Sequence, residues 1–339
     1  MKKRIIKYLI TGAAGFIGSN FVHYLYQKEQ DLEVRVLDKL TYAGNLQNLK
    51  ELEQYKGYQF IKGDICDAKI VREVMNDIDV VINFAAESAV DRSIDDPDAF
   101  LRTDIFGVYT LLNQARQQKN IKRFIQISTD EVYGQILNGS FSEDSELKPR
   151  NPYAASKAGG DRLAYSFFVT YGLPVIITRA SNNYGSRAYL EKVIPLFITN
   201  LMDGHKIPIY GEGKQVRDWL YVEDHCSAIY ILIEKGVKGE VYNIGGGQEC
   251  ANIELAKMIV RLMGRDQKCI EFVKDRPGHD FRYSLNCSKI KKLGWKPKYN
   301  LKEGLKKTIH WYQENQSHWR PLKESMDQRY LSGYWGAKT

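Results

Sequence analysis

A glycine-rich turn near the N-terminus constrains the fold of this 339-residue chain more than any other feature. Residues 5–11 form a short apolar run, and the sequence Gly12-Ala13-Ala14-Gly15-Phe16-Ile17-Gly18 follows it directly. Residues 19–25 then have the periodicity of an amphipathic helix. Glycines between a strand and a helix allow a tight turn, a close approach of the backbone to a pyrophosphate, and close packing of the helix on the strand. The pattern predicts a dinucleotide-binding α/β fold whose first helix points its N-terminus at the pyrophosphate.

An acidic residue after the next strand indicates which dinucleotide binds. The apolar run 33–37 ends in Asp38, which lies about 20 residues beyond Gly18. A carboxylate at this place accepts hydrogen bonds from a ribose diol and repels a 2′-phosphate, so NAD is favoured over NADP. The alternative is an acid that only caps a loop.

The rest of the first half continues the alternation of strands and helices. We expect further strands at 59–63, 80–86, 124–127 and 175–179, and helices at 68–76, about 97–118 and 153–171. This order predicts an α/β protein with a doubly wound parallel sheet of the Rossmann type and a smaller, mixed α/β C-terminal domain for the substrate. The expected boundaries are 1–185 for the NAD-binding domain, to which segments around 215–245 return, 186–322 for the substrate domain, and 323–339 for a C-terminal tail.

Composition excludes several classes of function. The net charge of +8 suits a protein that handles phosphates, but no nucleic-acid-binding motif accompanies it. The five cysteines and six histidines show neither disulfide nor metal-ligand spacing, so we expect free thiols and no metal. No apolar stretch approaches the length of a membrane span, and we expect a cytoplasmic protein.

Two short stretches carry groups suited to catalysis. Thr129, Asp130 and Glu131 follow the fifth predicted strand, at the sheet edge where ligands bind in open α/β folds. Tyr153 and Lys157 lie four residues apart, on one face of a predicted helix. A tyrosine and a lysine so placed suit the removal of a proton from an alcohol, and the two acids add a second acid–base function. The alternatives are a loop or cap role for the acids and a chance tyrosine–lysine pair.

Longer motifs resemble a known family. The glycine turn with the Tyr-x-x-x-Lys pair is similar to the extended short-chain dehydrogenase/reductase superfamily. A narrower set resembles the dTDP-glucose 4,6-dehydratase family from about residue 7 to residue 322: Ala85-Ala86-Glu87-Ser88, Ser128-Thr129-Asp130-Glu131-Val132-Tyr133-Gly134, Ser181-Asn182-Asn183-Tyr184-Gly185, residues 217–225 and Asp275-Arg276-Pro277-Gly278-His279-Asp280. The resemblance implies a lyase with tightly held NAD, a nucleotide-sugar substrate and a homodimer.

The resemblance also implies a role for each catalytic group. Tyr153 takes the proton of the C4 hydroxyl, with Lys157 and the nicotinamide charge favouring its ionised form, and Thr129 bonds the same oxygen. Glu131 removes the C5 proton, and Asp130 donates a proton to the departing C6 hydroxyl. The implied product is a nucleotide-linked 4-keto-6-deoxyglucose, an entry to rhamnose and other deoxysugars.

Binding residues follow from the matched motifs. The implied NAD contacts are Gly12, Gly15, Phe16, Ile17, Gly18, Asp38, Lys39, Thr41, Asp64, Ile65, Ala85, Ser88, Thr103, Tyr153, Lys157 and Asn183. The implied substrate contacts are Ser88, Thr129, Asn182, Glu191, Lys192, Pro208, Tyr210, Arg217, Asn252, Arg276, His279 and Tyr283.

The sequence departs from the family at three places, all on the substrate side. Ala89 stands where the family usually has histidine, residues 186–190 replace a run that usually begins Pro-Tyr, and Phe281 replaces an arginine. These departures leave open whether dTDP-glucose or UDP-glucose is the substrate. Less favoured functions for the chain are a nucleotide-sugar epimerase, a decarboxylase and an NAD-binding protein without turnover.

Overall fold

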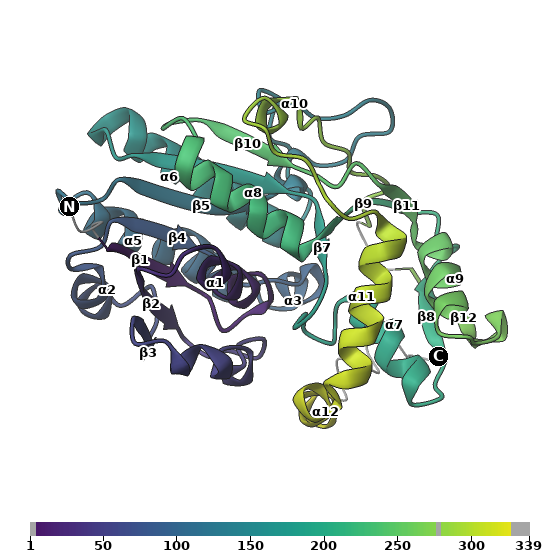
Figure 1. Cartoon of the computed structure of the whole chain (residues 1–339). Helices are drawn as coiled ribbons and strands as arrows, with labels where there is room; N and C mark the ends of the chain where they lie inside the picture. The colour runs from purple at the N-terminus through teal and green to yellow at the C-terminus, as the bar shows by residue number, and fades with distance from the viewer. Residues whose placement is uncertain (1–4, 276–278, 327–339) are drawn as a thin grey trace.

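A seven-stranded sheet forms the centre of the computed structural model, which describes residues 5–275 and 279–326 (Figure 1). Its strand order is β10-β6-β5-β4-β1-β2-β3, and all neighbouring strands pair in parallel. The chain enters the sheet at β1 and fills one side first, so the order reverses between β1 and β4. The predicted fold class is confirmed. The strands are β1 (Ile6–Thr11), β2 (Leu32–Asp38), β3 (Tyr58–Lys62), β4 (Val80–Asn83), β5 (Arg123–Thr129), β6 (Val175–Ala180) and β10 (Val241–Ile244).

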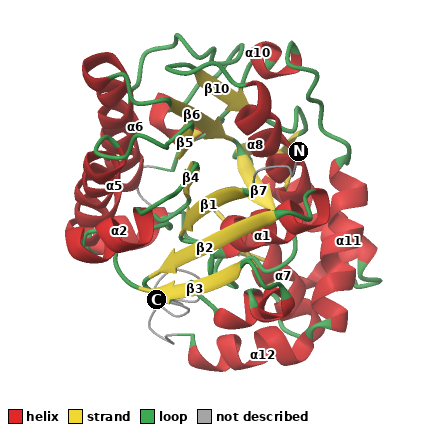
Figure 2. Cartoon of the chain, turned by 60° about the vertical axis from the view of Figure 1, so that its left-hand side comes forward, coloured by secondary structure: helices red, strands yellow, loops and turns green. Residues whose placement is uncertain are grey.

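Helices cover both faces of this sheet, so most of its strands are buried on both sides and consist largely of apolar residues. On one face, α1 (Phe16–Lys28) packs beside α8 (Val222–Lys235). On the other face, α2 (Ala68–Met75), α5 (Val108–Ala115) and α6 (Pro152–Tyr171) lie side by side (Figure 2). Each face has its own apolar core, with Phe21 and Leu232 in one and Leu111 and Phe167 in the other.

The predicted helix 97–118 is not one regular α-helix. It consists of α4 (Pro97–Leu101), a π-helical turn η3 (Arg102–Gly107) and α5. At η3 the backbone lies so close to α6 that a Cβ on Gly160 would stand 2.4 Å from the Asp104 carbonyl oxygen. The buried Asp104 carboxylate accepts hydrogen bonds from the Ser156 hydroxyl (2.7 Å) and the Glu87 amide (3.2 Å). Such π-turns are frequent at functional sites.

A second body packs against the carboxyl edge of the sheet. It holds a three-stranded sheet, β7 (Asn182–Tyr184), β9 (Val216–Tyr221) and β11 (Glu249–Ala251), and the pair β8 (Ile207–Tyr210) and β12 (Ile270–Val273). Its helices are α7 (Val193–Met202), α9 (Asn252–Leu262), α11 (Leu301–Glu314) and α12 (Gln316–Ser325), which enclose a separate apolar core. The remaining short elements are η1 (Leu46–Asn48), η2 (Lys50–Gln54), α3 (Val90–Asp95), η4 (Asp130–Tyr133), η5 (Gln267–Cys269) and α10 (Ser288–Lys291).

The segment 215–245 contributes to both bodies: β9 lies in the smaller sheet, whereas α8 and β10 join the large one. Helix α12 runs past residue 322, and the aromatic residues of the predicted tail lie outside the described residues. In the ranges 5–275 and 279–326, none of the helices combines the length and apolar character needed to cross a membrane.

Candidate active site

A cavity of about 420 Å³ lies between the two bodies, outside the carboxyl ends of the central strands. This is the position at which open α/β sheets bind ligands, where the strand order reverses. All sixteen residues predicted to contact NAD line the cavity, as do all five predicted catalytic residues. The structure therefore brings together groups that are spread over nearly the whole first half of the sequence.

The glycine turn leaves room for a dinucleotide at one end of this cavity. Gly12 has a φ of +67°, and a Cβ there would stand 2.4 Å from the amide nitrogen of Ala85. Two backbone amides fix the orientation of the Asp38 side chain: its carboxylate accepts hydrogen bonds from Ala14 and Leu40, both at 2.8 Å. Beside it, the Lys39 ammonium pairs with Asp64 at 2.7 Å. A cradle without side chains next to a fixed acid fits the pyrophosphate and ribose of NAD.

The two catalytic acids lie on a single turn in different environments. Strand β5 ends at Thr129, and the 3₁₀ turn η4 begins with Asp130 and Glu131. The Thr129 hydroxyl caps this turn by accepting from the Glu131 amide at 3.3 Å. Asp130 is 2% exposed, and burial together with the Glu131 charge raises its pKa well above the usual range. Burial thus favours the protonated form of Asp130, and its Oδ2 has no partner among the described residues.

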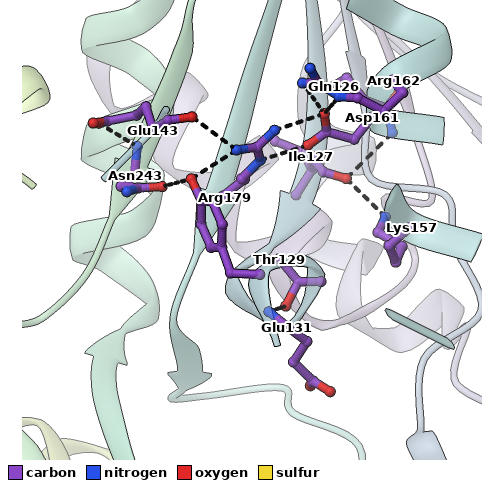
Figure 3. A network of polar contacts seen from close by, with 11 residues as sticks. Gln126, Ile127, Thr129, Glu131, Glu143, Lys157, Asp161, Arg162, Arg179 and Asn243 are labelled. Carbon is purple, nitrogen blue, oxygen red and sulfur yellow. Dashed lines mark hydrogen bonds and ion pairs between the residues drawn. The ribbon is translucent and has the colours of Figure 1, made fainter. Parts of the chain in front are cut away.

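Tyr153 and Lys157 occupy the first turns of α6, whose start is capped by Asn151. The Lys157 ammonium donates to the Ile127 carbonyl oxygen at 2.8 Å (Figure 3). Burial and the charges of Glu131 and Asp104 raise the pKa of Tyr153. This direction is opposite to the one expected from Lys157, because burial and the two carboxylates outweigh a nearby positive charge. Burial also lowers the pKa of Lys157.

The predicted substrate residues divide into three groups. Nine of them line the cavity. Pro208 and Tyr283 do not, because Pro208 lies in β8 paired with β12 and the Tyr283 ring lies against the guanidinium of Arg217. The roles of Pro208 and Tyr283 as substrate contacts stay predictions. Arg276 falls outside the described residues.

Contacts of the second body hold two of the lining residues in place. Arg217 is buried and donates to the carbonyl oxygen of Asp280 at 2.9 Å. The Glu191 carboxylate, 5% exposed, accepts from the Arg92 guanidinium at 3.2 Å. That guanidinium stacks 3.8 Å above the ring of Tyr42. Glu191 is therefore tied to the NAD-binding body across the cavity.

The three departures from the family differ in their access to this cavity. Ala89 lines it, with an unusual φ of +153°. In the run 186–190 only Tyr189 lines it, whereas the Ser186 hydroxyl donates to Asn20 of α1 at 2.9 Å. Phe281 is 45% exposed and is not a lining residue in the described part of the chain.

Sequence reasoning assigned no role to several ionisable residues of the cavity wall, among which Glu87 and His225 have strongly shifted pKa values. Burial and the nearby charge of Asp104 raise the pKa of Glu87 to about 7. His225 is fully buried, which lowers its pKa to about 3, and its Nδ1 lies 2.9 Å from Asn183 Oδ1. Both belong to motifs quoted for the family resemblance, and that membership was the signal that could have identified them.

Comparisons with known proteins agree with this geometry. Residues 9–308 match the family model described as GDP-mannose 4,6 dehydratase. A dTDP-glucose 4,6-dehydratase of Streptomyces niveus is 47% identical over 94% of this chain and 96% of its own length. The crystal structure of the Streptomyces venezuelae dTDP-glucose 4,6-dehydratase with NAD and TYD bound is 46% identical, with a TM-score of 0.91, covering 94% of this chain and 100% of that one.

Epimerases of the same superfamily are more distant. The UDP-glucuronic acid 4-epimerase of Bacillus cereus, crystallised with UDP-glucuronic acid and NAD, is 29% identical, with a TM-score of 0.86, over 91% of this chain and 99% of that one. The match to dehydratases is higher in identity over a similar length. This chain belongs to the dTDP-glucose 4,6-dehydratase family.

Proposed function

We propose that this protein is an NAD-dependent hydro-lyase that converts dTDP-glucose to the nucleotide-linked 4-keto-6-deoxyglucose. The observation that carries the proposal is the adjacent Asp130 and Glu131 in one cavity with Thr129, Tyr153 and Lys157. When bound, NAD would supply both the hydride acceptor and the hydride donor, which would make the reaction redox-neutral overall. Its cradle would be the Gly12 turn with Asp38.

The side chains of the chain account for the proton transfers. Tyr153 receives the proton of the C4 hydroxyl while Thr129 hydrogen-bonds the same oxygen. The resulting 4-keto group acidifies the C5 proton, which Glu131 removes, and Asp130 gives its proton to the C6 hydroxyl, which leaves as water. A proton returns to C5 when hydride is added at C6, which completes the 4-keto-6-deoxy sugar. Positioned acids and bases of this kind each contribute about 10²- to 10⁴-fold in rate.

The unequal burial of the two acids supports this division of roles. Asp130 is nearly inaccessible, whereas Glu131 is half-buried. Two carboxyl groups at one site act as acid and base when their environments separate their pKa values. An epimerase or a decarboxylase does not need such a pair, so the pair favours dehydration.

UDP-glucose is the second candidate substrate, because two of the positions that depart from the family line the cavity. These are Ala89 and Tyr189. A panel of dTDP-, UDP-, GDP- and CDP-glucose tests both the dehydratase activity and the preference for a nucleotide base. We expect dTDP-glucose to give the highest kcat/KM and a product lighter by one water, without net reduction of nicotinamide. An unchanged sugar or stoichiometric oxidation would contradict the proposed function, and a preference for UDP-glucose would establish the second candidate.

Substitution of Glu131 separates the two halves of the reaction. In Glu131→Gln, oxidation at C4 should persist, because Tyr153 and Lys157 are intact, but incorporation of deuterium at C5 from D₂O should be lost. Single-turnover nicotinamide absorbance measures the first process, and NMR of the sugar measures the second. Glu146→Gln, at an exposed acid paired with Lys148, is the control for loss of charge. Normal exchange in Glu131→Gln would remove the role assigned to this residue.

The pKa of Asp130 predicts a dependence of rate on pH. Because burial raises this pKa, the proton-donating form persists to higher pH than in an exposed aspartic acid and is lost as the pH rises through the raised value. We therefore expect kcat to decline on the alkaline side. In Asp130→Asn, kcat should fall by about 10²- to 10⁴-fold, and the remaining rate should lack this decline. An alkaline decline of the same position in Asp130→Asn would show that another group causes it.

We also propose a homodimer in the cytoplasm. The free thiols of the five cysteines support a reducing compartment. The dimer is supported by exposed apolar side chains gathered on η3, α5 and α6, which a monomer would leave in water. They are Phe106, Tyr109, Tyr165, Val169 and Tyr171, and Phe106 and Val169 are 64% and 63% exposed.

A substitution that introduces a charge on this surface tests whether the dimer forms through these helices. Val169→Glu should produce a monomer, because two carboxylates would be buried at the interface. Sedimentation velocity measures the change. Val237→Glu is the matched control, since Val237 is 56% exposed and lies outside these elements. The dimer through these helices is wrong if Val169→Glu sediments as the unmodified protein does.

A further inference from the structure

A buried ion pair lies behind the catalytic turn and takes no part in the proton transfers described above. Arg179 of β6 is 1% exposed, and Asp161 of α6 is fully buried. Their contact is bidentate: Arg179 Nε donates to Asp161 Oδ2 at 2.8 Å, and Arg179 Nη2 donates to Asp161 Oδ1 at 3.0 Å (Figure 3). Buried ion pairs of this kind often add little to stability compared with apolar residues of the same size. The pair therefore calls for a role other than stability.

The remaining guanidinium nitrogen of Arg179, Nη1, contacts the turn η4, which carries the two acids. This nitrogen donates to the hydroxyl of Tyr133 at 2.8 Å, and that hydroxyl in turn donates to Asn243 Oδ1 at 2.8 Å. The Asn243 amide donates to the carbonyl oxygens of Phe141 and Asn286, which sets the orientation of the amide. The Tyr133 ring is 1% exposed and stacks on Phe141 at 4.9 Å between centroids. The phenol is thus held by strands β6 and β10 at once.

The two ends of this network, Tyr133 and Asp161, lie within four residues of proposed catalytic groups in the sequence. Tyr133 ends the turn η4, three residues after Asp130 and two after Glu131. Asp161 lies four residues after Lys157, which is about one turn of α6. Arg179 consequently joins the turn that carries the two acids to the helix that carries Tyr153 and Lys157.

We propose that Tyr133, Arg179 and Asp161 are positioning residues that set the acid pair relative to the groups that oxidise C4. The proposal rests on the proposed function. Misplacement of a reacting group by about 1 Å can cost about 10²-fold in rate, and a single 3₁₀ turn has little rigidity of its own.

The two catalytic pairs depend unequally on Tyr133. Lys157 has its own bond to the Ile127 carbonyl oxygen and sits on a 20-residue helix. The acids sit on a four-residue turn that ends at Tyr133. Loss of the Tyr133 hydroxyl should therefore impair water elimination more than oxidation at C4.

Tyr133→Phe tests this, because it removes the hydroxyl and keeps the stacked ring. We expect kcat to fall about 10- to 100-fold, with KM changed by less than about twofold. C4 oxidation in a single turnover should stay near the unmodified rate, and C5 exchange with D₂O should slow as much as kcat. Tyr8→Phe is the matched control: Tyr8 is 1% exposed, and its hydroxyl donates to Glu29 at 3.2 Å, away from the cavity.

Arg179→Lys provides a second variant, since lysine keeps the charge but cannot form the bidentate contact. It should show the same step-selective loss. The proposal is overturned if Tyr133→Phe behaves like Tyr8→Phe, or if it slows C4 oxidation and C5 exchange equally. Failure of the proposed function is a separate result, visible in the unmodified enzyme: without elimination of water from any nucleotide glucose, both proposals fall.

Discussion

The close approach of β1 and β4 at their carboxyl ends is the constraint on which the active site depends. The Thr11 hydroxyl donates to Asn83 Oδ1 at 2.5 Å, and the Asn83 amide donates to Gln126 on β5 at 3.0 Å. This buried polar ladder holds three parallel strands in register just below the point where the strand order reverses. Gly12 follows immediately, and its missing side chain keeps the cavity open at Ala85. These polar contacts and the missing side chain of Gly12 together allow the glycine turn and the turn after β5 to line the same cavity.

Burial sets the electrostatics of the site more strongly than pairing does. Burial is the largest cause of the raised pKa of Asp130 and of the raised pKa of Tyr153. The Lys157 ammonium is bonded to the β5 backbone, which fixes the helix that carries Tyr153 against the strand that carries the acids. The positive nicotinamide charge of bound NAD would favour the ionised phenol. Closing a site around its ligand excludes water and strengthens the electrostatic interactions inside it.

Local sequence predicted the parts of the site that depend on backbone conformation. The Gly12 turn, Asp38 after β2 and the acids after β5 all follow a buried strand, so periodicity places them at one edge of a parallel sheet. The π-turn at η3 was not predictable, because residues 97–118 keep a helical pattern throughout. At this turn the backbone packs closely on Gly160, which lies more than fifty residues further along. Pro208 and Tyr283 are expected as substrate contacts only from the family motifs. In the structure Pro208 lies in β8 paired with β12, and the Tyr283 ring lies against Arg217.

The sequence by itself determined the class of fold, the preference for NAD and the set of candidate catalytic groups, because each rests on a short motif in a recognisable strand or helix. Only the tertiary structure decided how these groups are tuned. Segments far apart in the chain produce three features of the site. They bury Asp130 more deeply than Glu131, place Glu87 and His225 in the cavity wall, and join Arg179 to Tyr133. Desolvation and hydrogen-bond geometry depend on three-dimensional neighbours, and no local pattern of residues encodes them.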